Sequence, residues 1–381
     1  RFSESGMNAG QASRQAGCPA DRDETGTRTL RRHADVVAAA LDSRTFSSRV
    51  SRHLNIPNGM DGEQHARYRG LVERYMTPER VAPLEGRFRQ IAARLIGSLP
   101  RDHRVDAVSG IGSLFAVRAQ SAWLGWPAEA EAPLLEWMEQ NRDAARSGRL
   151  ELHAAVAESF DRIIRSLIED GPGTGVRSPR GVTAELLAER VEGRPLAIEE
   201  VVSILRNWTA GDLGTIAACV GVVVERLAKD PELQCRWRHD RPDPDEMNRE
   251  IDELLRIDDP FTASRRVTTR PVETGGQMVP SGERVHLGWA QANRDPEAFG
   301  DPDAFRPLEN AARNLVYGIG PHVCPGRGLA TLEIRVVVEE LLAATASLEP
   351  YPGRAPVRAR PQQGGFQSVP IRLRASSGPG A

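Results

Sequence analysis

One cysteine stands in a loop whose residue types suit metal chemistry. Cys324 lies within residues 317–326, which read YGIGPHVCPG. Glycines let a backbone approach a flat ligand closely, and amide donors near a sulfur stabilise the charge of a thiolate. The apolar run from Leu329 to Ile334 predicts a helix just after the cysteine, and the positive end of that helix lowers the pKa of a nearby thiol. The segment therefore indicates a thiolate ligand to haem iron.

The order of residues in this loop resembles a known pattern. The sequence aromatic, Gly-x-Gly-x-His-x-Cys-x-Gly is similar to the cysteine loop of the cytochrome P450 monooxygenases, and every position is matched from Tyr317 to Gly326. For an isolated cysteine, the alternative is a buried side chain in a glycine-rich turn. The resemblance implies that Cys324 is the axial ligand of a non-covalently bound heme b, iron protoporphyrin IX.

Several residues match the elements that hold the haem propionates in this family. Buried carboxylates require cationic or hydrogen-bonding partners. His65 and Arg69 lie four apart and share one face of a predicted helix, and Arg266 opens a predicted strand. The resemblance adds His322 as a further donor and Asn314 at a position where many relatives carry a propionate-binding histidine. The alternative for each cation is a solvated surface charge.

A second feature is a carboxylate and a guanidinium three positions apart. Glu253 and Arg256 project from one face of a predicted helix and can pair directly. Most such pairs lie on solvated helix faces and contribute little to stability. In the resembled family the pair is buried, braces the segment before the cysteine loop and is completed by a third arginine. Arg306 and Arg313 are the two candidates for that arginine.

The predicted helix over 198–229 carries an acid and a hydroxyl that suit proton transfer. Asp212 and Thr215 lie three apart and share a face of this helix. The family pattern is Ala-Gly-x-acid-Thr, in which the acid and the hydroxyl relay protons. Alignment on Ala210-Gly211 displaces Asp212 and Thr215 by one position each. We predict that they form the catalytic relay; the alternative is that they satisfy a kink at the neighbouring glycines.

By analogy with the family, six residues are predicted to line the substrate pocket. Apolar and aromatic walls suit a small hydrophobic molecule. For the aromatic residues, packing in the core is the alternative. The predicted set is Met60, Trp208, Thr209, Gly211, Phe261 and Phe366.

The elements that position these residues are mostly helical. Helical spacing of apolar residues predicts helices, whereas short β-branched segments between Pro and Gly after residue 256 predict strands. The expected fold class is mainly α with a small β portion. In the family this is a long central helix over the haem, with the cysteine loop before a late helix. Helices are predicted over 29–42, 77–99, 105–124, 132–145, 150–168, 183–191, 198–229 and from the cysteine loop to about 346; an irregular segment over 293–314; and a strand pair over 366–373.

Composition narrows the class of protein further. The net charge is -2 over 381 residues and no run of Lys or Arg occurs, which argues against nucleic acid as a partner. The longest apolar stretch, 216–224, is too short to cross a membrane. The four cysteines are widely spaced, so neither a zinc site nor a disulfide framework is indicated, and a cytoplasmic location is expected. Residues 1–29 read as a polar N-terminal arm, and 30–381 as one haem-thiolate monooxygenase domain.

The resemblance implies a reaction and its partners. One oxygen atom from O2 would enter a small hydrophobic or aromatic substrate, by hydroxylation or oxidative dealkylation. No Gly-x-Gly-x-x-Gly site or ferredoxin cysteine cluster is present, so NAD(P)H electrons are expected through a separate reductase and a ferredoxin or flavodoxin. The chain is also similar to haem domains of self-sufficient bacterial members. The alternatives are an H2O2-dependent peroxygenase and a non-catalytic haem-binding sensor.

Overall fold

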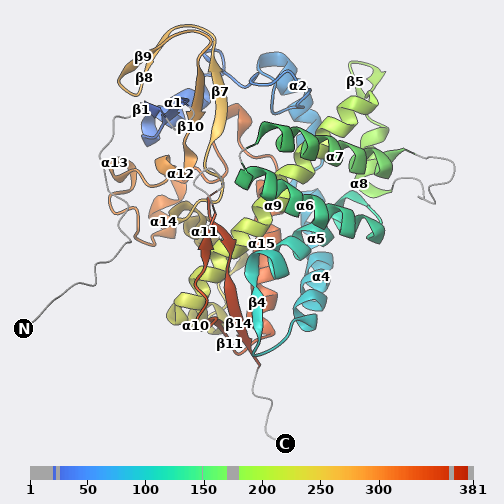
Figure 1. Ribbon diagram of the computed structural model, residues 1–381, viewed down its shortest axis with the longest axis vertical. Helices are drawn as coiled ribbons and strands as arrows, with labels where there is room; N and C mark the ends of the chain where they lie inside the picture. The colour runs from blue at the N-terminus through green and yellow to red at the C-terminus, as the bar shows by residue number, and fades with distance from the viewer. Residues whose placement is uncertain (1–19, 23–25, 148, 170–179, 360–363, 376–381) are drawn as a thin grey trace, which may run out of the picture.

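A long central helix organises the molecule. The computed structural model describes residues 20–22, 26–147, 149–169, 180–359 and 364–375. Helix α9 (Ile198–Lys229, 32 residues) crosses the middle of the molecule, and α15 (Arg327–Ala343) packs beside it (Figure 1). Both helices bury residues around most of their circumference because neighbours cover them on several sides. The predicted mainly helical fold with a small sheet portion is confirmed.

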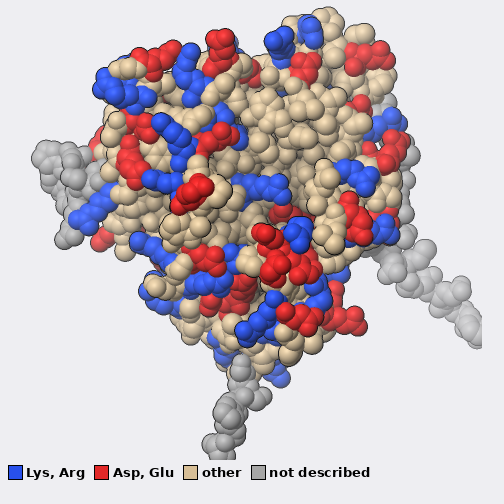
Figure 2. Space-filling view, turned by 180° about the vertical axis from the view of Figure 1, so that it is seen from behind, with Lys and Arg blue, Asp and Glu red and all other residues tan. Residues whose placement is uncertain are grey.

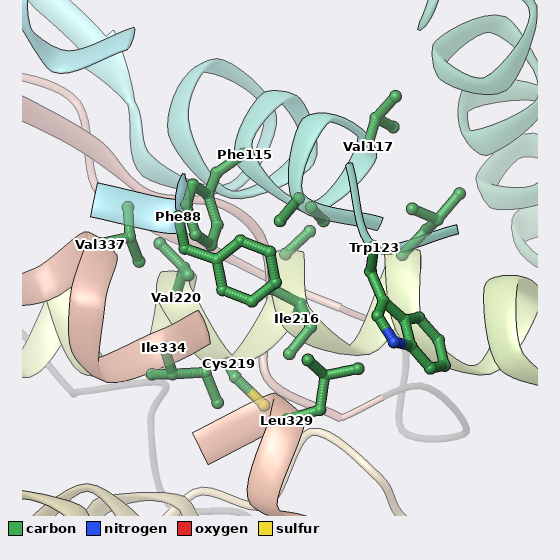
Figure 3. Close-up of a cluster of buried hydrophobic side chains, with 14 of the residues drawn as sticks. Phe88, Phe115, Val117, Trp123, Ile216, Cys219, Val220, Leu329, Ile334 and Val337 are labelled. Carbon is green, nitrogen blue, oxygen red and sulfur yellow. The ribbon is translucent and has the colours of Figure 1, made fainter. Parts of the chain in front are cut away.

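Two further helices complete the core around this pair. Helices α4 (Glu85–Ser98) and α5 (Leu114–Leu124) pack against α15 and α9. Figure 3 shows Phe88 and Phe115 facing Val220 and Val337 in one apolar cluster. Burial of one such aromatic side chain contributes about 1.5–3 kcal/mol. This packing fixes α9 relative to α15, and with them the two walls of the candidate site.

The remaining helices are shorter and lie around this core. Several begin with Pro after an Asp whose carboxylate accepts a backbone N–H, as at Asp243, which accepts from Glu246 N at 2.9 Å. Their bounds are α1 His33–Leu41, α2 Gly62–Glu73, α3 Pro78–Val81, α6 Glu131–Ser147, α7 Leu150–Ile168, α8 Gly181–Leu187, α10 Pro231–His239, α11 Pro244–Ile257, α12 Trp289–Ala292, α13 Pro296–Phe299 and α14 Pro307–Asn310.

The strands form one larger sheet and several small ones. The five-stranded sheet has the order β1-β2-β10-β7-β3, with β2 and β10 parallel and the other pairs antiparallel. Its strands are β1 Ala20–Arg22, β2 Arg28–Leu30, β3 Phe46–Ser47, β7 Ser264–Thr268 and β10 Arg284–Leu287. A three-stranded sheet has the order β11-β14-β4 (Ser347–Pro350, Pro370–Arg374, Arg104–Asp106); the two-stranded sheets pair β5 Arg190–Val191 with β6 Arg194–Pro195, β8 Val272–Thr274 with β9 Gln277–Val279, and β12 Val357–Arg358 with β13 Phe366–Ser368.

The structure departs from the predicted elements mainly at their ends. The helix predicted from residue 105 begins later, because Arg104–Asp106 pair as strand β4 and the Asp106 carboxylate accepts from Val108 N and Ser109 N. The segment predicted as irregular over 293–314 contains α13 and α14. The predicted arm over 1–29 lies largely outside the described residues, and its described part includes β1.

Positive and negative side chains do not form separate patches on the face opposite that of Figure 1. There, basic and acidic side chains of the described residues are interspersed (Figure 2). Across the described residues, no helix combines the length and apolar character that crossing a membrane requires.

Candidate active site

The loop that carries the cysteine is held in one conformation by its own backbone. The amide of Cys324 donates to Tyr317 O at 2.8 Å, and Val323 N donates to Gly320 O at 3.0 Å. Gly318 and Gly320 have φ of 71° and 79°, in the left-handed region that favours glycine. A Cβ on Gly320 would also lie 3.0 Å from Ala40 O. The two glycines are therefore required by the turn itself.

Cys324 lines a cavity, and its sulfur lies close to Gly326. A Cβ at Gly326 would lie 3.8 Å from Cys324 Sγ and 3.7 Å from Met76 Sδ. Helix α15 begins at Arg327, as the apolar run predicted. Burial raises the pKa of the Cys324 thiol, while the backbone N–H of Gly326 acts in the opposite direction. The loop thus presents a sulfur with a local amide donor.

A cavity of about 360 Å³ lies between this loop and α9. Its walls are mixed: apolar side chains alternate with a small number of titratable ones. The loop and α15 contribute Cys324, Gly326, Leu329, Ala330 and Ile334; α9 contributes Asn207, Trp208, Gly211, Asp212, Thr215, Ile216 and Cys219; and other segments contribute Val72, Met76, Gln120, Trp123, Asp259, Phe261, Arg266 and His322. The sulfur and the α9 residues therefore open into one space.

His65, Arg69, Arg266 and His322 form a cluster of histidines and arginines, and Arg266 and His322 of this cluster line the cavity. The rings of His65 and His322 lie 4.1 Å apart between centroids. Burial, followed by the nearby His65, lowers the pKa of His322 to about 3. His65 Nε2 is buried without a hydrogen-bond partner. The four residues thus lie near one another, and their role in holding the propionates stays a prediction.

The two arginines of this cluster differ in how they are paired. Arg69 donates from Nε to Glu73 at 2.6 Å. Arg266 is 7% exposed and donates to Arg265 O at 2.8 Å, and it forms no ion pair with any described residue. A buried guanidinium requires hydrogen-bonded or charged partners. Arg266 and the unpartnered His65 Nε2 therefore suit a ligand that carries carboxylates, such as haem.

Asn314 is engaged elsewhere. Its Nδ2 donates to Asp252 O at 2.9 Å, and its Oδ1 accepts from Val316 N at 2.9 Å. It is not among the described residues that line the cavity. In this arrangement the side chain holds the start of the cysteine loop against α11.

Glu253 and Arg256 form a buried pair below the loop. Arg256 Nε and Nη2 donate to the two Glu253 carboxylate oxygens at 2.8 and 2.9 Å, and both side chains are at most 1% exposed. Arg256 also donates to the carbonyls of Asn293 at 2.7 Å and Pro302 at 3.1 Å. The pair therefore fixes the segment that leads to the cysteine loop, as predicted for a structural pair.

The partner that completes this pair is not an arginine side chain. Glu253 Oε1 accepts from the backbone N–H of Arg306 at 3.0 Å and from Asn310 Nδ2 at 2.7 Å. The guanidinium of Arg313 instead stacks over Phe299, 6.0 Å from its centroid. Asn310 supplies a neutral donor where the resemblance implied a cation.

The predicted proton relay faces the cavity. Asp212 and Thr215 both line it, whereas Leu213 between them is fully buried in the core. Asp212 Oδ2 is buried without a partner, and burial raises the pKa of this carboxyl to about 7. A shared face for the two side chains follows from their spacing.

The predicted pocket residues divide into two groups. Trp208, Gly211 and Phe261 line the cavity. Met60, Thr209 and Phe366 are buried at 6%, 0% and 5% exposure and are not among its described lining residues. Thr209 accepts a 3.4 Å hydrogen bond from Gln120 Nε2, and Phe366 lies under the Arg358 guanidinium at 4.0 Å. Three of the six predicted pocket residues thus line this cavity, and the other three pack in the core beside it.

Two buried carboxyl groups escaped the sequence analysis. Asp259 lines the cavity and accepts from Phe261 N at 2.8 Å and from Asn293 Nδ2 at 3.0 Å; its burial raises its pKa to about 8. Glu333 is fully buried on α15. The signal for Glu333 was a charged residue inside the apolar run that follows Cys324.

Comparison with known proteins gives a consistent result. A family profile described as "Cytochrome P450" matches residues 100–373. Cyclomarin C epoxidase CymV of Salinispora arenicola is 27% identical over 84% of this chain and 84% of its own length. The vitamin D(3) 25-hydroxylase of Pseudonocardia autotrophica is 30% identical over 82% and 79%. A solved structure of a mutant of P450 EryK with erythromycin B is 26% identical, covers 95% of both chains and has a TM-score of 0.81.

Proposed function

The chain belongs to the cytochrome P450 family, and from that premise we propose that it is a haem-thiolate monooxygenase for small hydrophobic or aromatic molecules. One oxygen atom of O2 enters the substrate, by hydroxylation or oxidative dealkylation, and the other leaves as water. The observation that carries this proposal is the position of Cys324, which opens into the same cavity as Asp212 and Thr215 of α9.

The residues around the cavity suit a haem group. Cys324 would provide the axial sulfur, and Arg69, Arg266, His65 and His322 would hold the propionates. When bound, the haem supplies the activation of dioxygen, which thiolate ligation favours. The left-handed turns at Gly318 and Gly320 keep the loop compact, and Gly326 leaves room beside the sulfur. The guanidinium groups of Arg69 and Arg266 would offset the charge of two buried carboxylates, and the two histidines, whose pKa values are lowered by burial, would serve as neutral hydrogen-bond donors.

Asp212 and Thr215 are the groups that handle protons on the α9 side. A carboxyl with a pKa near 7 is present in both protonation states at neutral pH, so it can give and regain a proton readily. The Thr215 hydroxyl lies on the same helix face and can accept a hydrogen bond and donate one. Leu213 and Gly214 stand where the family pattern has the acid and the threonine, so the acid of this chain lies one position earlier and its hydroxyl one position later.

Substrate binding falls to the apolar and aromatic part of the cavity. Trp208, Phe261 and Ile216 line it, and Phe261 is 46% exposed at its edge. Such a wall favours an uncharged hydrophobic molecule over a polar one. The names of the relatives describe an epoxidase and a hydroxylase, which are both oxygen-inserting enzymes. They support the reaction class for this chain and leave its substrate to experiment.

The test is turnover with two sources of oxidising equivalents. We expect oxygenated product from a panel of small aromatic and terpenoid compounds when NAD(P)H, a reductase and a ferredoxin or flavodoxin are supplied. Labelled O2 should place one labelled atom in the product. Product formed only with H2O2 would favour a peroxygenase, which the displaced Asp212 and Thr215 make worth testing. Electron consumption with no product from any compound, with or without H2O2, would contradict both.

A further inference from the structure

A second cavity lies outside the candidate active site, between α4 and α5. Its volume is about 390 Å³, which is within the range of sites that hold small organic molecules. We call this space the α4–α5 cleft. Among the described residues, none lines both cavities. The lining residues of the cleft are Arg87, Ile91 and Arg94 of α4; Val117, Arg118, Ser121 and Ala122 of α5; and Trp126, Pro127, Ala128 and Glu131.

The floor of the cleft is apolar. Ile91, Val117 and Trp126 form it, and each is at most 8% exposed. Trp126 Nε1 donates to Thr183 Oγ1 at 3.0 Å, and an indole ring has no other hydrogen-bond donor. The ring is therefore held in one orientation and offers the cleft only apolar surface. An aromatic ring packs well against such a surface.

Two arginines of α4 bring unpaired positive charge to the cleft. Arg87 stands four positions before Ile91 and Arg94 three positions after it, so the three side chains share one face of the helix. Both arginines are exposed, and neither has an ion pair or a side-chain hydrogen bond with any described residue. By contrast, Arg89 on the same helix pairs with three glutamates. The unpaired cations of α4 thus lie on the face that lines the cleft.

The α5 side adds a fixed guanidinium and a hydroxyl without a partner. Arg118 Nε and Nη2 each donate to one carboxylate oxygen of Glu131 at 2.9 Å, so the charge of this acid is already neutralised. Ser121 has a buried Oγ with no hydrogen-bond partner. A buried hydroxyl without a partner is unfavourable unless a ligand supplies the missing hydrogen bond. The polar groups of the cleft therefore suit an anion that accepts hydrogen bonds.

We propose that the α4–α5 cleft binds an aromatic carboxylate. The ring lies against Ile91 and Trp126, and the carboxylate accepts hydrogen bonds from the guanidinium groups of Arg87 and Arg94. An inorganic anion would leave the apolar floor uncovered, and an uncharged aromatic molecule would leave both arginines without a partner. The combination of charge and apolar surface thus selects a small organic anion. This proposal does not depend on the proposed function.

Helix α5 separates this cleft from the cavity beside the cysteine loop. Val117 and Trp123 point to different sides of α5 (Figure 3). Val117 and Ser121 line the cleft, whereas Gln120 and Trp123 line the cavity beside the cysteine loop. A molecule that fills the second space therefore leaves the cleft open, so that binding in the two places can be measured separately.

The test is a calorimetric titration of the haem-bound protein with 2-naphthoate. Saturating 4-phenylimidazole, an azole that coordinates haem iron, occupies the cavity beside the cysteine loop throughout. We expect one 2-naphthoate to bind per chain, with an affinity that falls as the salt concentration rises. Uncharged 2-naphthamide should bind about tenfold more weakly or less. No binding of 2-naphthoate would overturn the site, and inorganic phosphate that binds as tightly would overturn the aromatic class of ligand.

Substitutions in the cleft show where the anion binds. Arg87→Gln and Arg94→Gln should each weaken 2-naphthoate binding about tenfold or more, since each removes a charged hydrogen bond. Ser121→Ala should weaken it about threefold. Both arginines are exposed, so these variants should fold, and thermal unfolding checks that they do. The matched control is Arg162→Gln, at an exposed arginine of α7, which should bind as wild type. Wild-type affinity in both α4 variants would place the anion elsewhere and overturn the proposal.

An acidic peptide is the other occupant that this charge favours. We expect a peptide of alternating Glu and Phe to bind the azole-blocked protein more weakly than 2-naphthoate does. A peptide that binds and loses affinity in Arg94→Gln, while 2-naphthoate fails to bind, would make the cleft a protein-docking surface and overturn the assignment of a small organic anion.

Discussion

Two buried polar regions of this protein differ in how completely they are satisfied. Below the cysteine loop, Glu253 and Arg256 exchange two hydrogen bonds, and their remaining capacity is used by backbone groups and Asn310. Around the cavity, His65 Nε2 and Asp212 Oδ2 have no partner. The hydrogen-bonding groups of the first network are thus satisfied, whereas the second network retains buried polar atoms without partners. We call the first the closed network and the second the open network.

The difference separates structural from functional polar groups. A buried ion pair with every donor and acceptor used defines one geometry for the segments it joins. A buried polar group without a partner costs about 1–3 kcal/mol and is retained where a ligand or a reaction supplies what is missing. The closed network braces the loop of Cys324, and the open one surrounds the space that the loop faces.

The largest expected effect lies in the closed network. Glu253→Gln leaves the Arg256 guanidinium buried with one neutral partner, and we expect the free energy of unfolding to fall by about 3–5 kcal/mol. Denaturant unfolding measures it. Glu151→Gln, in an exposed pair with Arg149, is the control and should change stability by less than about 1 kcal/mol. Equal effects of the two changes would contradict the assignment of Glu253 as a brace.

A change in the open network should spare folding and weaken ligand binding. Arg266→Gln removes a buried cation that has no ion pair among the described residues, so we expect little loss of folding stability. Haem should dissociate about 10- to 100-fold faster, because a hydrogen bond to a charged group contributes about 1.5–3 kcal/mol. Transfer of haem to an acceptor protein measures this rate. The neighbouring exposed Arg265→Gln should release haem at the wild-type rate; the same acceleration in both variants would count against a propionate contact.

Alanine substitutions at Gly320 and Gly326 compare a strained backbone position with one that has room for a side chain. Gly320→Ala forces a side chain into a left-handed conformation and within 3.0 Å of Ala40 O, so we expect a loss of about 1–3 kcal/mol in unfolding free energy. Gly326→Ala meets only ordinary contacts at 3.7 and 3.8 Å and should cost less than about 1 kcal/mol. Thermal unfolding of both variants measures the two losses. A larger loss of stability in Gly326→Ala than in Gly320→Ala would contradict the described conformation of the loop.

Asp259 gives an intermediate case, with hydrogen bonds but no cation. Its pKa is raised from 3.8 to about 8, so the folded state holds a proton that the unfolded state releases. Stability should therefore fall as pH rises from about 4 to about 8, by up to about 1.4 kcal/mol per pH unit. In Asp259→Asn that contribution disappears, and the stability difference between the two proteins should flatten above about pH 8. A difference that does not vary with pH would exclude a neutral Asp259.

Much of the fold could be predicted because local patterns determined it. The bounds of α7 and α9 match the predicted helices, since long amphipathic or apolar periods are specific signals. The start of the helix at 105 was wrong, because strand pairing with β14 overrides local propensity there. The segment predicted as irregular contains helices of four residues that begin with Pro. Helices this short do not produce a detectable hydrophobic periodicity.

The site shows the same division between local and tertiary information. Cys324, His65 and Arg69 could be proposed as site residues because their spacing within one loop or one helix turn resembles the family pattern. The neutral partner of Glu253 could not, since Asn310 reaches it through a turn whose path no spacing specifies. Asn314 was predicted as a donor to the propionates, but backbone groups of Asp252 and Val316 take up its side-chain hydrogen bonds.

The measurement that tests the central claim most directly is the absorption spectrum of the reduced protein treated with carbon monoxide. A Cys324 thiolate on the iron predicts the long-wavelength band that is characteristic of this ligation, and Cys324→Ser should abolish it while haem remains bound through other contacts. A wild-type protein that binds haem but shows no such band, or a serine variant that retains it, would contradict the account.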